Sequence, residues 1–395
     1  MLVDLDNTDV SYEEPRNGRW LTGEAADAAE DEYLAVLAFD SELLTEREGF
    51  FSPFMTTWGR FSDYQAFEQD EVLRHALRTD LWDALRQLLS HFERGQDDLF
   101  DRVAKAKFGR TPDGDKRTDR LSLLHDQTAH FLRAFTYDVD EITIQAGERI
   151  AEAHGAAPEL LQEFTENIVS SGLAAELWRQ IHDLHREFME IWESLSPVLN
   201  LRYWKKEPAD LTKFSVTSKD FERIRHFYLS CYETISQMSV LAIGVEAIAR
   251  WRQLSIPTRK GTMSVIPRFA ELASSNKAAH LGKHPPLDEL FVPHMDSVIR
   301  NGVAHHASFY DFGSDEVVCV KSSSGAIEET YRENYTLFCR RVLDLMSSVT
   351  RLEIYLYILL MLVDGEYQPA GSLRPGPSAS EAPRGVENSI RYRTI

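Results

Sequence analysis

Hydrophobic residues recur every three or four positions over most of this chain, which is the period of an amphipathic helix. The most regular stripes run through residues 221–249 and 335–363, where apolar side chains keep to one face over the whole length. The second stripe also holds a seven-residue repeat across four heptads, as long packed helices do. We therefore expect two long helices late in the chain, each burying one face.

The same period predicts a series of helices in the first half of the chain. They are expected over residues 69–99, 121–136, 140–155, 158–170 and 172–194. Pro197 is expected to end the last of them, because proline lacks the N–H that continues a helix. Residues 201–216 are then expected to link two helical domains, 33–200 and 217–363.

Between the two long stripes the pattern changes. Residues 268–280 predict a short helix, Leu254–Pro267 predicts a loop, and Pro293 suits the first turn of the helix that follows. Short strands are expected at Phe309–Asp311, Val317–Val320 and Ala326–Glu329. The expected fold class is all-α, with an N-terminal helical domain followed by a four-helix bundle that carries a small β-hairpin insertion.

Charge is distributed unevenly along the 395 residues. The net charge is −20, and residues 1–216 hold the whole excess, with 43 acidic against 23 basic residues. Residues 1–32 are expected to be an acidic, poorly ordered leader and 364–395 a disordered tail. Since the start carries no cationic, apolar signal and the cysteines are few, a cytoplasmic protein without a membrane segment is expected.

One stretch combines polar chemistry with a helical pattern. Residues 295–306 read M-D-S-V-I-R-N-G-V-A-H-H and hold Arg300, Asn301, His305 and His306 between apolar residues. An arginine followed five positions later by a histidine also occurs at Arg86–His91, Arg120–His125 and Arg149–His154, so the spacing alone carries little weight. Arg300 differs because Asn follows it directly and because two long striped helices flank its segment.

In these features residues 217–363 resemble the HEPN superfamily (higher eukaryotes and prokaryotes nucleotide-binding), and in particular HEPN domains of bacterial toxins and abortive-infection systems. The resemblance implies a metal-independent endoribonuclease without a cofactor, with a site shared by the two copies of a homodimer. It implies that Arg300 stabilises phosphate charge, that His305 is the acid or base, and that Asn301 orients them. The products expected are a 2′,3′-cyclic phosphate and a 5′-OH.

Four points about this motif stay open. His306 follows His305 directly, so either histidine fits; His305 is favoured because on a helix it shares a face with Asn301. Some HEPN toxins place Tyr two residues after the histidine, where this chain has Ala307. The cluster could also be structural, with His305 held by the fold. Glu246 could face the cleft that holds this motif, although an ion-pair role is favoured.

The function predicted is cleavage of single-stranded RNA by a toxin or anti-phage defence effector. Residues 1–216 are expected to be a regulatory region that binds a protein trigger or inhibitor. The alternative is a catalytically inactive helical scaffold or an RNA-binding adaptor. His182 and His185 lack the spacing of a zinc-binding histidine pair, and the sequence has no phosphate-binding P-loop or nucleophile elbow.

Overall fold

The computed structural model describes residues 64–362, except for 137–138, 204–210, 214–215, 260, 286, 294 and 324–325; it also describes residues 2–3 and 10–11. The chain divides into two compact units, Met1–Glu46 and Arg47–Ile395. In the first unit, strands β1 (Leu2–Val3) and β2 (Val10–Ser11) form an antiparallel pair. The rest of the expected leader, 1–32, and the expected tail, 364–395, lie outside the described residues.

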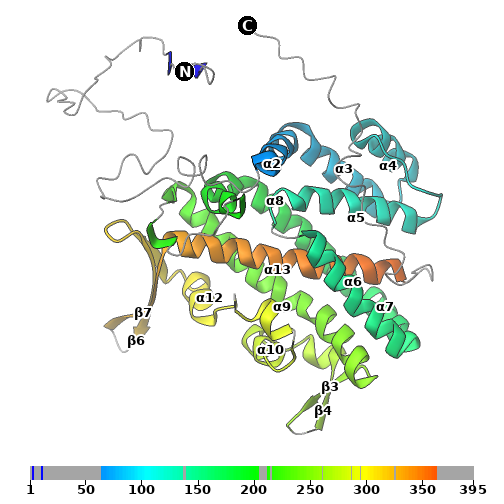
Figure 1. Ribbon diagram of the computed structural model, residues 1–395. Helices are drawn as coiled ribbons and strands as arrows, with labels where there is room; N and C mark the ends of the chain where they lie inside the picture. Colours follow the sequence, from blue (N-terminus) through cyan, green and yellow to red (C-terminus); the bar gives the residue numbers. More distant parts are fainter. Residues whose placement is uncertain are drawn as a thin grey trace, which may run out of the picture. The chain divides into compact units, whose positions relative to one another are not determined.

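The described part of the second unit is mostly helical (Figure 1), as the hydrophobic period predicts. Before residue 204 its helices are α2 (Tyr64–Ala76), α3 (Trp82–Glu93), α4 (Asp97–Val103), α5 (Arg117–Arg133), α6 (Val139–Ala156), α7 (Pro158–Ser170) and α8 (Leu173–Leu199). After residue 217 they are α9 (Phe221–Trp251), α10 (Ser274–Leu281), α11 (Leu287–Phe291), α12 (Ser297–Ala304) and α13 (Tyr335–Leu362).

Helices α9 and α13 form the centre of this unit. They pack against each other, and α6 and α8 pack on both of them (Figure 1). The α7–α9 contact is also close: a β-carbon added to Gly244 of α9 would come within 2.2 Å of the ring of Phe164 on α7. Helices from both halves of the chain therefore share one hydrophobic core.

The expected boundary between 33–200 and 217–363 does not separate two cores. Arg74 is fully buried and donates hydrogen bonds to the carbonyl of Ala134 at 2.9 Å, to Oδ1 of Asn200 at 3.0 Å and to the hydroxyl of Tyr203 at 2.9 Å. A buried guanidinium needs such partners. The first residues of the expected linker thus belong to the core of the N-terminal helices, and the structure has no division at this point.

Pro197 lies inside α8 and does not end it, contrary to expectation. Proline cannot donate to the carbonyl four residues earlier, which here belongs to Glu193. The hydroxyl of Ser196 donates to that carbonyl at 2.8 Å. The last turn of α8 therefore continues to Leu199 with this acceptor satisfied.

The sheet after α12 confirms the three predicted strands and extends them. Strands β5 (Ser308–Asp311), β6 (Glu316–Ser323) and β7 (Ala326–Asn334) form an antiparallel sheet in the order β5-β6-β7. The predicted loop at 254–267 is wrong in part, because β3 (Ser255–Thr258) and β4 (Gly261–Ser264) pair as a hairpin within it.

Helix α13 is long and apolar enough to cross a membrane by length and composition. In the structure its apolar surface is used within the fold, since 72% of its most apolar window is buried. The seven-residue repeat of the sequence therefore corresponds to packing against α9, α6 and α8.

Candidate functional site

Helix α12 carries the arginine–histidine motif and lies against α9. Its start is capped by Asp296, whose Oδ1 accepts hydrogen bonds from the backbone N–H groups of Val298 at 2.7 Å and Ile299 at 3.3 Å. Such a cap satisfies donors that the beginning of a helix leaves without partners. The helix therefore begins at Ser297, and the expectation that Pro293 lies in its first turn is wrong.

Gly302 allows α12 to approach strand β6 closely. A β-carbon on this residue would lie 2.7 Å from Sγ and 2.8 Å from Cβ of Cys319. Gly302 therefore serves a close approach between the helix and a side chain of the strand. Burial raises the pKa of the Cys319 thiol to about 11, so this sulfur is protonated at neutral pH and is a packing group.

Arg300 is oriented by a carboxylate on another helix. Its Nε donates to Oε1 of Glu233 on α9 at 2.7 Å, and its Nη2 lies 2.5 Å from the same oxygen. Its Nη1 donates to Oδ1 of Asn301 at 3.1 Å. About a third of each charged side chain stays exposed, 31% for Arg300 and 34% for Glu233. The guanidinium is thus fixed in direction while one face remains open to solvent.

Two further polar residues reach the other side of Glu233. Ser274, at the start of α10, donates its hydroxyl to Oε2 of Glu233 at 3.1 Å. Lys277, one turn later, is only 3% exposed and shares a cavity of about 390 Å³ with Glu233 and Ser274. Burial lowers the pKa of the Lys277 ammonium, and the nearby Glu233 carboxylate partly offsets this effect. One carboxylate therefore lies among two cations and a hydroxyl.

The two histidines follow the end of α12. The backbone N–H of His305 still bonds to the carbonyl of Asn301 at 3.0 Å, so the four-residue relation between them is kept. His306 has a left-handed backbone with φ of 53°. The N–H groups of His306 and Ala307 bond to the carbonyls of Val303 and Gly302, at 3.1 Å and 2.8 Å. This is the Schellman arrangement that terminates many helices, with His306 in the place usually taken by glycine.

Both imidazoles are exposed. Neither ring makes a hydrogen bond or an ion pair with another described residue. These observations give no support to the alternative that His305 has a structural role. The structure brings Arg300 and Asn301 together and adds no contact between either histidine and Arg300. On a helix, residues five apart point about 140° away from each other, which agrees with this separation.

The other arginine–histidine pairs of the same spacing have local structural partners. Arg120 is nearly buried and forms a two-oxygen contact with Asp101, at 3.0 Å and 2.8 Å. Arg86 lies 3.4 Å from Asp83 of its own helix, and Arg149 lies 2.8 Å from Glu152 of its own helix. The Arg300 pair is distinguished by its carboxylate partner, which lies 67 residues away in the sequence.

Glu246 has the ion-pair role that was favoured. It is 4% exposed and its carboxylate lies 2.8 Å from Nε of Arg250, one turn along α9. Burial raises the pKa of this carboxyl, and Arg250 works against that rise. The acid near Arg300 is instead Glu233, which sequence reasoning missed because it sits outside the apolar stripe and has no motif around it.

The described residues include no group of three or more histidine, cysteine, aspartate or glutamate side chains placed to hold a metal ion. The site is thus a cluster of an arginine, a lysine and a carboxylate, with two exposed imidazoles at the end of α12 that make no hydrogen bond or ion pair with these described side chains. We compared the chain with family models, curated proteins and solved structures, and none of them matches it.

Proposed function

We propose that this protein is a metal-independent endoribonuclease of the HEPN type, which cleaves single-stranded RNA at Arg300 and His305. The proposal is carried by one observation: the Arg300 guanidinium is held in a fixed direction by Glu233 and Asn301, and two exposed imidazoles that make no hydrogen bond or ion pair with the described residues follow the end of the same short helix. The order of elements also supports it. Along the chain, α12 and the sheet β5-β6-β7 come between the long helices α9 and α13, which pack on each other.

Cleavage of RNA without a metal requires a base for the 2′-OH, an acid for the leaving 5′-oxygen, and positive charge at the phosphate. In the proposed reaction, Arg300 binds the non-bridging phosphate oxygens through the N–H groups of Nη1 and Nη2 that Glu233 and Asn301 leave free. The His305 imidazole transfers a proton, since imidazole is effective near neutral pH. Asn301 fixes the plane of the guanidinium. The 2′-oxygen attacks phosphorus, the bond to the 5′-oxygen breaks, and a 2′,3′-cyclic phosphate and a 5′-OH result.

A second copy of the chain would complete the site by supplying the second imidazole. The surface around α12 offers apolar area for such a contact. Val298 is 42% exposed, Phe309 48% and Phe312 83%. Exposed large apolar side chains in one region are typical of interaction surfaces. We infer that this surface, made by the beginning of α12 and the turn after β5, is part of a homodimer interface.

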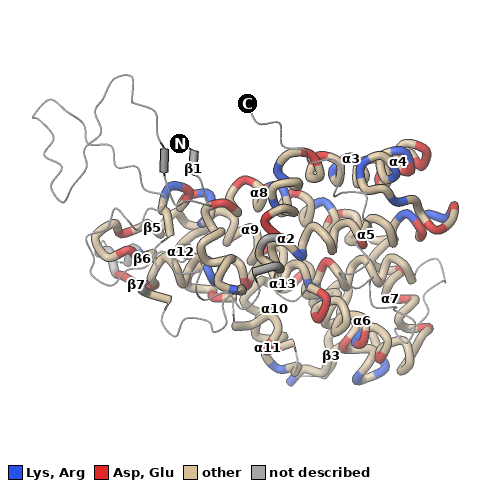
Figure 2. Tube along the Cα trace, turned by 45° about the horizontal axis from the view of Figure 1, so that its top comes forward, with Lys and Arg blue, Asp and Glu red and all other residues tan. Residues whose placement is uncertain are grey.

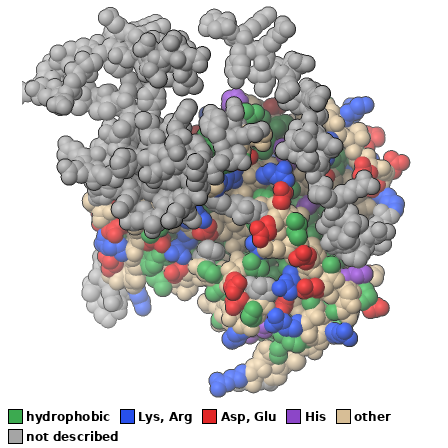
Figure 3. Space-filling view, in the orientation of Figure 1, with side chains coloured by type: hydrophobic (Ala, Val, Ile, Leu, Met, Phe, Trp, Pro, Cys, Tyr) green, Lys and Arg blue, Asp and Glu red, His purple; other side chains and the backbone are tan. Residues whose placement is uncertain are grey.

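The charge distribution limits how RNA can bind. In Figure 2 acidic and basic residues are mixed along α3 and α4, and in Figure 3 both signs are interspersed on the visible face of the described part. Affinity for a nucleic-acid backbone depends on neutralising phosphates. In the proposal, Arg300 therefore provides the local phosphate contact, and the substrate is a short single-stranded segment. A role as a toxin or anti-phage effector, with the N-terminal helices as the place where a protein trigger or inhibitor acts, is part of the same proposal.

The test is cleavage of single-stranded RNA in EDTA by the wild type and by the Arg300→Ala and His305→Ala variants. Arg149→Ala and His154→Ala are matched controls, since they change a pair with the same spacing elsewhere on the chain. We expect cleavage by the wild type and both controls, and a loss of at least a hundredfold in both site variants. Equal rates in all five proteins, or none in the wild type, would refute the proposal.

A second candidate is an inactive scaffold or RNA-binding adaptor. It is favoured by the fact that every nitrogen of the Arg300 guanidinium already has a protein partner. In that case Arg300 holds α12 on α9 and the imidazoles have no chemical role. Arg300→Ala would then lower the melting temperature, while His305→Ala would change neither stability nor RNA binding.

A further inference from the structure

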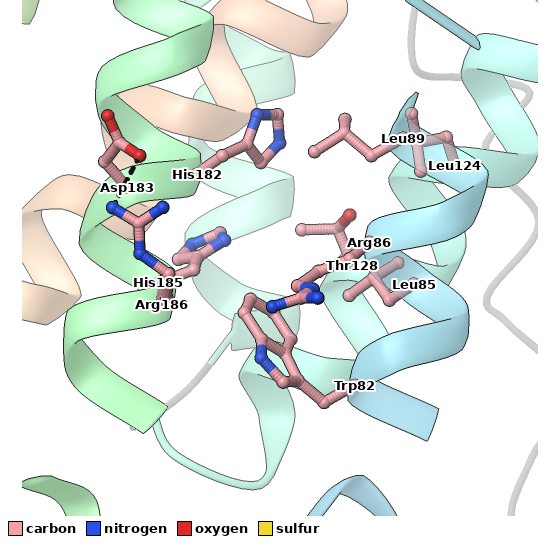
Figure 4. Close-up of a pocket in the computed structure, with 10 residues that line it drawn as sticks. All are labelled: Trp82, Leu85, Arg86, Leu89, Leu124, Thr128, His182, Asp183, His185 and Arg186. Atoms are coloured by element: carbon pink, nitrogen blue, oxygen red, sulfur yellow. Dashed lines mark ion pairs between the residues drawn. The ribbon is translucent and has the colours of Figure 1, made fainter. Parts of the chain in front are cut away.

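A cavity of about 350 Å³ lies among α3, α5 and α8, and none of its lining residues belongs to the α12 site (Figure 4). Its apolar wall consists of Trp82, Leu85, Leu89 and Leu124. The volume is within the range of small-molecule sites, which combine apolar walls with a few convergent polar groups. An aromatic ring with leucines beside it suits a planar apolar surface in the occupant.

Two histidines that line this cavity each have a buried ring nitrogen without a hydrogen-bond partner. These atoms are Nδ1 of His182 and Nε2 of His185; both are closed to solvent, and neither has a hydrogen bond in the described structure. His185 Nε2 lies 3.0 Å from a carboxylate oxygen of the buried Glu353, close enough for an ion pair but without hydrogen-bond geometry. Trp178 does not line the cavity, but its ring is 5.1 Å from that of His182, and its indole N–H has no partner among the described residues.

Native interiors leave few buried polar groups unpaired, so such a concentration indicates a partner outside the described residues. Burial lowers the pKa of His182 well below its usual value. Its imidazole is therefore neutral at pH 7, with one nitrogen that donates and one that accepts. Heteroaromatic ring nitrogens and exocyclic amino or carbonyl groups offer the complementary pattern.

Two arginines line the cavity, one from each of two facing helices (Figure 4). Arg86 comes from α3 and Arg186 from α8, and both side chains are more than half exposed. Each pairs with an acid three residues earlier on its own helix, Asp83 at 3.4 Å and Asp183 at 2.9 Å. Exposed pairs of this kind contribute little to stability, so both guanidinium groups can turn to an anion at the cavity.

We propose that this cavity is a binding site for a free small molecule with a nucleobase-sized heteroaromatic ring and one anionic group, of which a nucleoside monophosphate is the simplest example. The ring lies against Trp82 and the leucines and bonds to His182, and the anion lies between Arg86 and Arg186. A long RNA is disfavoured, since residues 1–216 hold 43 acidic and 23 basic residues and would repel a polyanion.

The test is calorimetric titration of the full chain with 5′-AMP, 5′-GMP, 5′-CMP and 5′-UMP. Two reference compounds are included: adenosine, which lacks the anion, and ribose 5-phosphate, which lacks the base. We expect at least one monophosphate to bind saturably at one site per chain, and both reference compounds to bind at least tenfold more weakly. His182→Phe keeps a ring but removes its nitrogens, and the double variant Arg86→Gln/Arg186→Gln removes the cations; each should weaken binding at least tenfold.

Arg102→Gln is the matched control, since Arg102 is an exposed arginine on α4 outside the cavity lining, and it should bind like the wild type. Unchanged melting temperatures show that the variants are folded. Absence of saturable binding by all four monophosphates, or binding that the cavity variants leave unchanged, would overturn the proposal. Tighter binding of a single-stranded RNA oligonucleotide that the same variants weaken would make the cavity part of an RNA surface and would overturn it as well. None of these results depends on ribonuclease activity.

Discussion

Arg300 and Glu233 are 67 residues apart in the sequence, and the structure joins them through a hydrogen bond of 2.7 Å between Nε and Oε1. The contact fixes the guanidinium on the surface of α9 and neutralises much of its charge. Because neither side chain is fully buried, water and ions can compete for both groups. Glu233 is therefore both the residue that positions Arg300 and the one that a phosphate must displace or share.

The first prediction concerns this carboxylate. Glu233→Gln keeps an oxygen that can accept from the Arg300 N–H and removes the negative charge. We expect tighter binding of single-stranded RNA, by about threefold to tenfold at low salt, because one repulsive charge next to the phosphate is lost. Fluorescence anisotropy with a labelled, non-cleavable oligonucleotide measures the change. Glu176→Gln is the matched control. Glu176 lines the cavity of about 390 Å³ that Glu233 also lines, but it has no bond to Arg300, so its change should have a smaller effect. Weaker binding by Glu233→Gln would contradict this assignment.

The second prediction separates the two histidines. His306 occupies a left-handed backbone position that glycine adopts without strain. His306→Gly should therefore keep or raise the free energy of unfolding, by up to about 1 kcal/mol. If His305 is the proton-transfer group, this variant also keeps cleavage within a few-fold of wild type. Urea unfolding and the RNA assay measure the two quantities. Loss of cleavage in a stably folded His306→Gly variant would assign the chemistry to His306 instead.

The third prediction concerns the close contact between α12 and β6. Gly302→Ala places a methyl group 2.7 Å from Sγ of Cys319, so the helix or the strand must move. Overpacking of this kind costs about 1–3 kcal/mol. We expect a lower melting temperature and reduced cleavage, since the end of α12 carries His305. Cys319→Gly removes both the Sγ and the Cβ that this methyl group meets, so combining it with Gly302→Ala should restore part of the stability. A double variant no more stable than Gly302→Ala would show that the strain lies elsewhere.

The fourth prediction is a pH dependence caused by Lys277. Burial lowers its pKa below the usual 10.5, so between the two values the unfolded chain binds more protons than the folded one. Stability then rises with pH through the folded pKa towards 10.5, as the buried charge is lost. Lys277→Met lacks this group and should be more stable than wild type at pH 7. The difference in free energy of unfolding should shrink as pH increases towards 10. A difference that stays constant or grows would contradict the burial effect.

Much of the fold could be predicted from the sequence, because its signals are local. The apolar stripes of α9 and α13 and the alternating residues of β5 and β6 depend only on near neighbours. The absence of a division at 201–216 was not predictable in this way. Whether helices before and after a proline-containing stretch share a core depends on long-range packing, such as the contact between Gly244 and Phe164.

The candidate site was predicted in part for the same reason. Arg300 and Asn301 are adjacent, so their pairing follows from local geometry. Glu233 and Lys277 come from two other helices, and no motif marks either residue. The end of α12 at Ala304 was also missed, because its terminating residue is a histidine where a glycine is usual.

The most direct measurement of the central claim is the chemistry of the RNA ends. A single-stranded RNA is incubated with the full chain in EDTA, and the fragments are examined by mass spectrometry and by 5′ labelling with and without phosphatase treatment. Cleavage through Arg300 and His305 predicts fragments with a 2′,3′-cyclic phosphate and a 5′-OH that accept label directly, and none of them with His305→Ala. Fragments that carry 5′-phosphates, the same fragments from His305→Ala, or intact RNA in every sample would contradict it.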